Sequence, residues 1–139
     1  MERLTVDGKL DSLEAIAQYV KAATAKAGLD KKASYRLRQA VDEIATNIIC
    51  HGYEAAGREG VLDLWADIDQ KVLKIYIEDT GVTYDPRQTP TPKDKELRSP
   101  LDKRHIGGLG VYLALGSVDE FLYERVGTRN RNIFIVHLN

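Results

Sequence analysis

The chain of 139 residues contains a single cysteine, Cys50. A disulfide within the chain and a cysteine-rich metal cage are therefore excluded. No apolar run approaches the roughly 20 residues that a membrane-spanning helix needs. The first seven residues also lack the apolar stretch of a signal peptide. These absences predict a cytoplasmic protein without a membrane segment.

An excess of positive charge is also missing. Lysine and arginine number 20 and aspartate and glutamate 21, which gives a net charge of -1. A protein that binds nucleic acid directly needs surplus cations to displace counterions from phosphates. Direct binding to nucleic acid is therefore disfavoured, and any anion site must be local. Hydrophobic residues make up 43% of the chain, enough for the core of one domain over residues 1–139.

Apolar periodicity predicts helices alternating with hairpins. Three helical patterns are expected, from about Asp11 to Gly28, from Asp30 to about Tyr53, and over 108–116. Strand-like alternation predicts an edge strand over 3–7 and two hairpins, 61–68 with 72–77 and 118–126 with 130–138. The layout predicts an α+β fold, a two-layer α/β sandwich.

All four prolines lie between residues 83 and 105, where apolar periodicity disappears. A loop of this length inside a compact domain is usually a functional lid or a disordered segment. Both interpretations stay open on the sequence alone.

The second predicted helix has an unusual polar stripe. Glu43, Asn47 and His51 are spaced four residues apart, so they lie along one side of a helix. An amide oxygen is a suitable ligand for Mg²⁺, and a carboxylate one turn earlier can accept a proton from a hydroxyl group. The alternative is an ordinary solvated face. For His51, capping or packing at the helix end competes with a ligand role.

Two glycine-containing turns accompany this stripe. Asp79 and Gly81 end the second strand of the first hairpin, where they can be simple turn residues or can bind a base. The stretch 106–111, Ile-Gly-Gly-Leu-Gly-Val, precedes an apolar helix and can offer backbone N–H groups to an anion. It lacks the Lys-Ser/Thr of a P-loop. Lys103, Arg104 and His105 precede it, and they either neutralise phosphate charge or are simply solvated.

The order of these motifs resembles the gyrase, histidine kinase and MutL type of ATP-binding domain. Within that superfamily, the run from Asp42 to Tyr53, the Tyr84-Asp85-Pro86 sequence and the Gly-Gly-Leu-Gly turn are similar to the anti-sigma factor serine/threonine kinases. The resemblance covers essentially the whole chain. It implies a Bergerat-type fold, in which three helices lie on one face of a mixed, mainly antiparallel sheet, with an ATP lid at about 83–106.

The same resemblance implies residue roles. Glu43 would be the general base, and Asn47 would hold Mg²⁺. Asp79 would bind adenine, with Gly81 and Thr128 beside the base. The phosphates would contact the glycine turn, which consists of Gly107, Gly108, Leu109 and Gly110.

The implied partners are a STAS-type anti-anti-sigma protein as substrate, a sigma factor as the sequestered protein, and a second copy of the chain in a homodimer. A competing hypothesis is a binding module that sequesters a regulator and uses ATP only as a structural ligand. An ATPase motor would need transducer domains, and a histidine kinase core would need a helical phosphoacceptor domain. The chain has no room for either.

Overall fold

The computed structural model describes residues 1–88 and 106–138. Helices and strands follow one another in the order β1 (Leu4–Asp7), η1 (Leu10–Ser12), α1 (Leu13–Ala27), α2 (Lys31–Asn47), η2 (Ile48–Glu54), β2 (Val61–Ile68), β3 (Val72–Asp79), η3 (Pro86–Gln88), α4 (Ile106–Gly116), β4 (Glu120–Val126) and β5 (Arg129–His137). These elements confirm the predicted helices and hairpins to within a few residues. None of the described helices is long and apolar enough to cross a membrane.

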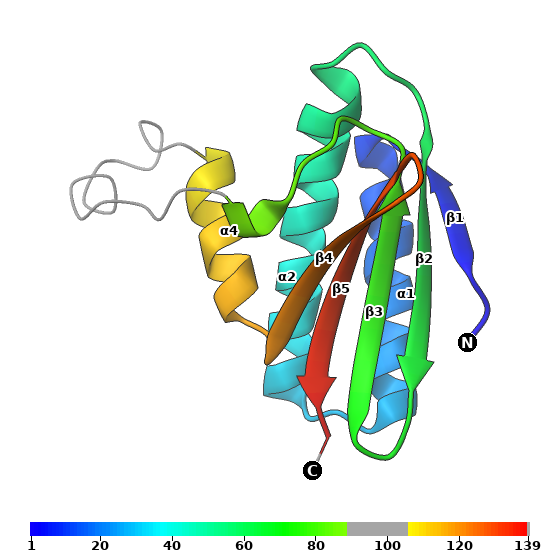
Figure 1. The fold of residues 1–139 in the computed structure, drawn as a ribbon. Coiled ribbons are helices and arrows are strands. Elements are labelled where there is room, and N and C mark those ends of the chain that lie inside the picture. Colours follow the sequence, from blue (N-terminus) through cyan, green and yellow to red (C-terminus); the bar gives the residue numbers. More distant parts are fainter. Residues whose placement is uncertain (89–105, 139) are drawn as a thin grey trace.

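The strands form one sheet with the order β1-β2-β3-β5-β4. Each of the four pairings between the described strands is antiparallel. Helices α1 and α2 cover one face of this sheet, and α4 lies beside α2 (Figure 1). The α+β sandwich predicted from the sequence is therefore confirmed, but the described sheet is antiparallel throughout and not mixed as the resemblance implied.

Helix ends follow familiar chemistry. Asp30 caps α2, because its carboxylate accepts a hydrogen bond from the backbone N–H of Ala33 at 2.8 Å. Gly28 ends α1 with a φ of 71°, a left-handed conformation that glycine adopts without strain. The second predicted helix is continuous up to about Tyr53, but its last part, η2, is π-helical. Such wider turns occur often at functional sites.

Tyr53 joins η2 to the ends of two strands. Its hydroxyl donates to the carbonyl of Val61 at 2.7 Å and accepts from the N–H of Thr80 at 2.8 Å. The ring is fully buried, and a Cβ atom at Gly8 or Gly60 would lie within 2.7 Å of it. Small residues on both sides therefore let the tyrosine fix the end of β3, which carries Asp79.

The two faces of the sheet differ in composition. The covered face contributes leucine and isoleucine side chains to a core that it shares with α1 and α2. On the other face, Trp65 stacks on Tyr76 with ring centroids 4.8 Å apart, and the guanidinium of Arg3 lies 4.1 Å from the tryptophan ring centre. Arg131 pairs there with Glu78 and Glu124. The functional cavity must therefore be sought on the helical side.

Candidate functional site

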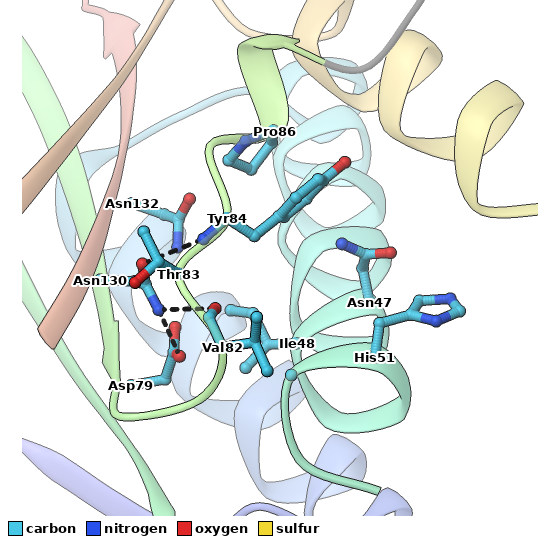
Figure 2. Close-up of a pocket in the computed structure, with 11 residues that line it drawn as sticks. Asn47, Ile48, His51, Asp79, Val82, Thr83, Tyr84, Pro86, Asn130 and Asn132 are labelled. Carbon is cyan, nitrogen blue, oxygen red and sulfur yellow. Dashed lines mark hydrogen bonds between the residues drawn. The ribbon is translucent and has the colours of Figure 1, made fainter. Parts of the chain in front are cut away.

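A cavity of about 140 Å³ lies between the helices and the ends of β3 and β5. This volume is close to the roughly 150 Å³ that admits a benzene-sized ring in an engineered protein cavity. Helix α2, η2, the end of β3, the loop after it and β5 supply the walls (Figure 2). Its lining residues are Asn47, Ile48, His51, Gly52, Asp79, Val82, Thr83, Tyr84, Pro86, Asn130 and Asn132.

Asp79 ends β3 and is only 3% exposed. Its Oδ1 atom accepts hydrogen bonds from the N–H of Gly81 at 2.9 Å and from the side chain of Asn130 at 3.0 Å. Its Oδ2 atom has no partner. Burial raises the pKa of this carboxyl above its ordinary range, although the two hydrogen bonds act in the opposite direction. One oxygen is therefore held in place and the other is left for a ligand.

Asn130 is the residue that holds Asp79. The two face each other across the β3–β5 pair. Besides the bond to Asp79, the Nδ2 atom of Asn130 donates to the carbonyl oxygen of Val82 at 3.1 Å. Its Oδ1 atom accepts from the N–H of Tyr84 at 3.3 Å and from the hydroxyl of Tyr123. One carboxamide thus joins β3, β4, β5 and the loop after β3.

Asn132 lies two residues further along β5 and points to the same side of the sheet. It is 1% exposed, and its Oδ1 atom has no hydrogen-bond partner. Asn130 and Asn132 were not among the residues selected from the sequence. The alternating pattern of 130–138 placed them on one face, but only the β3–β5 register shows that this face lies next to Asp79.

Gly81 is close to the backbone of η2. A Cβ atom at this position would lie 2.8 Å from the carbonyl oxygen of Gly52 and 3.1 Å from Oδ1 of Asp79. The N–H of Val82 donates to the same Gly52 carbonyl at 3.2 Å. Glycine is therefore required here because two segments of backbone meet.

The polar stripe of α2 divides at the start of η2. Asn47 is buried and lines the cavity, together with Asp79. His51 also borders the cavity, but it is exposed, and Figure 2 shows its ring pointing away from Asp79. In an α-helix, two residues four positions apart lie on the same side. The wider π-helical turn of η2 changes this relation, so His51 does not follow Asn47 along one side of the helix.

Glu43 is half-buried and does not line the cavity; its carboxylate lies against α4. A Cβ atom at Gly110 would lie 2.0 Å from Oε1 of Glu43, so only glycine leaves room for this contact. Burial raises the pKa of Glu43, and the negative charge of Asp42 raises it further. A raised pKa makes the ionised carboxylate a stronger proton acceptor.

The remaining predicted site residues lie in two places. The turn with Gly107, Gly108, Leu109 and Gly110 forms the first part of α4, which packs against α2. Thr128 is exposed in the turn between β4 and β5, and it is not among the cavity residues. Most of the predicted lid, with Lys103, Arg104 and His105, lies outside the described residues.

The described start of the predicted lid runs along the cavity. Tyr84 and Pro86 line it, and Figure 2 shows the tyrosine ring between the loop and α2. Arg87 pairs with Asp85 at 2.9 Å and donates to the carbonyl of Tyr123 at 3.4 Å. This stretch of the loop is therefore attached to β4.

The donor set of the cavity suits a cation that is shared with a ligand. Among residues 1–88 and 106–138, no three His, Cys, Asp or Glu side chains form a cluster that could hold a metal ion by themselves. The carboxamide of Asn47 is a neutral oxygen ligand of the kind that Mg²⁺ accepts, together with water and phosphate oxygens.

Comparison with known proteins gives a consistent result. The profile of the family described as "Histidine kinase-like ATPase domain" matches residues 6–135. Proteins named "Serine-protein kinase RsbW" from Staphylococcus aureus strains RF122 / ET3-1 and MRSA252 are each 32% identical over 84 residues, 58% of this chain and 52% of theirs. The chain thus spans about half the length of these curated relatives. The histidine kinase domain from the Erythrobacter litoralis EL346 blue-light activated histidine kinase is 18% identical, with a TM-score of 0.53 over 89% of this chain and 60% of its own.

Proposed function

The chain belongs to the histidine kinase-like ATPase domain family, and from this premise we propose that its cavity binds the base of Mg·ATP. The observation that carries the proposal is the free oxygen of Asp79, which is buried, lines the cavity and lacks a partner. A buried acceptor without a partner costs about 1–3 kcal/mol, so a bound amino group would be favoured there.

In this proposal, Asp79 accepts a hydrogen bond from the amino group of adenine, with Gly81 and Thr128 beside the base. The backbone N–H groups of Gly107, Gly108, Leu109 and Gly110 contact the phosphates. Support comes from the position of this glycine turn at the start of α4, because free N–H groups at a helix start favour anions.

Asn47 is the proposed protein ligand of Mg²⁺. The buried carboxamide lines the cavity that also contains Asp79, so an ion bound there would lie near the nucleotide. When bound, Mg²⁺ supplies positive charge that neutralises the phosphate oxygens. Asn47 would hold the ion through its side-chain oxygen.

We further propose that the protein is a serine/threonine kinase and that Glu43 is its general base. The hydroxyl oxygen of the substrate forms a bond to the γ-phosphorus, the bond to the β–γ bridging oxygen breaks, and ADP leaves. The hydroxyl proton passes to Glu43. The raised pKa of Glu43 supports this role. Since the carboxylate lies against Gly110, it must turn toward the substrate when the complex forms.

The proposed substrate is a STAS-type anti-anti-sigma protein. In its unphosphorylated form, this substrate would compete with a sigma factor for binding to the kinase. The kinase would act in the cytoplasm and would be a homodimer. Support comes from the curated relatives, which are named serine-protein kinases. The match to these relatives covers 84 residues, about half of their length. The identity of the partners is therefore proposed and tested separately from nucleotide binding.

The decisive experiment measures ATP affinity by calorimetry and transfer of labelled γ-phosphate to STAS proteins. Glu43→Gln should abolish transfer and leave ATP affinity within about threefold, because it removes the base and keeps the shape. Asp79→Asn should weaken ATP binding by about 30-fold or more, because it replaces the free acceptor with a donor. Glu14→Gln, an exposed change on α1, is the matched control. Full transfer by Glu43→Gln would contradict the role of Glu43 as the general base, and no transfer by the unsubstituted protein would contradict the kinase assignment.

A second candidate function is a binding module in which ATP is only a structural ligand. The contact between Glu43 and Gly110 favours it, because the carboxylate is directed toward α4 and lies outside the cavity lining. Under this alternative, ATP would strengthen the capture of a regulator, and no label would be transferred. The transfer assay above distinguishes the two.

A further inference from the structure

The cavity contains two hydrogen-bond acceptors that nothing in the fold satisfies. Among the described residues, the buried side-chain N or O atoms that lack a partner are Oδ2 of Asp79 and Oδ1 of Asn132, and both residues line this cavity. Buried polar groups in folded proteins are nearly always paired. Two exceptions in one cavity therefore point to a ligand with two N–H donors.

The strand register brings the two residues close together. Asp79 faces Asn130 across the β3–β5 pair, and Asn132 faces Ile77. Asp79 and Asn132 are thus diagonal neighbours on the same face of the sheet, with backbones about 7–8 Å apart. At this separation, two side chains that both point into the cavity can reach a single edge of a heteroaromatic ring.

Asn132 has no evident structural task. Its neighbour on the same face, Asn130, holds β3, β4 and the loop after β3 through its carboxamide. Asn132 forms none of the side-chain hydrogen bonds of the described residues, although it is 1% exposed in an inner strand of the sheet. Asparagine is disfavoured in strands, and leucine or valine would fill the same space without an unpaired oxygen.

We propose that Asn132 is a second base-selecting residue: its side-chain oxygen accepts one hydrogen of the exocyclic amino group of adenine, while Asp79 accepts the other. The inference rests on the proposed binding of ATP and makes it more specific. The amino group of adenine has two hydrogens that point in different directions, so acceptors on two adjacent strands can each bind one. A purine without this amino group leaves both oxygens unpaired.

The test is a cycle of two ligands and two proteins. Calorimetry in the presence of Mg²⁺ compares ATP with purine riboside 5′-triphosphate, which differs only by the missing amino group. The proteins are the unsubstituted chain and Asn132→Leu, which removes the carboxamide at similar volume. His137→Leu, an exposed position on the same strand, is the control. Far-ultraviolet circular dichroism verifies that each variant is folded.

We expect Asn132→Leu to bind ATP about 10-fold more weakly and to bind the purine analogue within about threefold of the unsubstituted protein. His137→Leu should change neither affinity. An equal loss for both ligands, or no loss for ATP, would overturn the role of Asn132 and leave the proposed function intact. Failure of the unsubstituted protein to bind ATP would overturn both. If Asn132→Leu is not folded, Asn132→Ala replaces it in the same cycle.

Discussion

The two ends of the proposed nucleotide site are built in different ways. At the base end, Oδ1 of Asp79 is held by two hydrogen bonds, one from Asn130 across the β3–β5 pair and one from the N–H of Gly81. At the phosphate end, Glu43 is positioned by contact between two helices, α2 and α4, at Gly110. Strand pairing fixes the base end by several directional bonds, whereas helix packing leaves the carboxylate able to turn. Under the proposed function, the pocket for the base is therefore preformed, and the site of phosphate transfer is adjustable.

The largest expected effect is at the base end. Asn130→Ala should lower the free energy of unfolding by about 2–4 kcal/mol, because Asp79 and Val82 lose a donor and Tyr123 loses an acceptor in a buried network. Chemical denaturation followed by circular dichroism measures this change. Thr128→Ala, in the exposed turn of the same hairpin, should stay within about 0.5 kcal/mol. Equal values for the two variants would show that the base end is not fixed by this network.

The second-largest expected effect is on the rate of phosphate transfer, at the phosphate end of the site. Gly110→Ala should change the free energy of unfolding by no more than about 1 kcal/mol, because the Glu43 side chain can move and alanine favours a helix. The rate of phosphate transfer should nevertheless fall about 10-fold, because the added Cβ displaces the Glu43 carboxylate. Gly116→Ala, where a Cβ meets nothing within 4 Å, is the control on the same helix. Severe unfolding of Gly110→Ala would mean that this end is as rigid as the other.

The smallest effect concerns pH. Phosphate transfer should rise with pH through the pKa of Glu43, because only the ionised carboxylate accepts a proton. Burial raises this pKa, and the charge of Asp42 adds to the increase. Asp42→Asn removes the second cause, so the acid limb of the rate profile should move to lower pH. Asp11→Asn, an exposed change outside α2, should not move it. A shift to higher pH would contradict Glu43 as the base.

Much of the fold could be predicted from the sequence. The spacing of apolar residues identified α1, α2 and both hairpins. Each of these elements buries one face, and the repeat of its apolar residues shows whether it is a helix or a strand and which face is buried. The α+β layout and the alignment of Glu43 with Asn47 on one helix followed from the same rule. The π-helical geometry of η2 left no local signal, so the direction of His51 was not foreseen.

The site was only partly predictable. Asp79 was selected because it is a charged residue at a strand end, and it lines the cavity. The roles of Gly81 and of the glycine turn in nucleotide binding stay predictions. Asn130 and Asn132 were missed, because their importance depends on which residues of β3 they face. The contact of Glu43 with Gly110 depends on how two distant helices pack. Both are tertiary facts that no local pattern contains.

The aromatic stack on the open face of the sheet has a practical consequence. The chain has one tryptophan, Trp65, and its side chain belongs to the sheet face opposite the core and the cavity. Its ultraviolet emission is therefore expected to report on the attachment of the N-terminal residues through Arg3, and to change little when the cavity fills. Titrations that rely on intrinsic fluorescence would then miss occupancy, so a nucleotide that carries its own dye is the better probe.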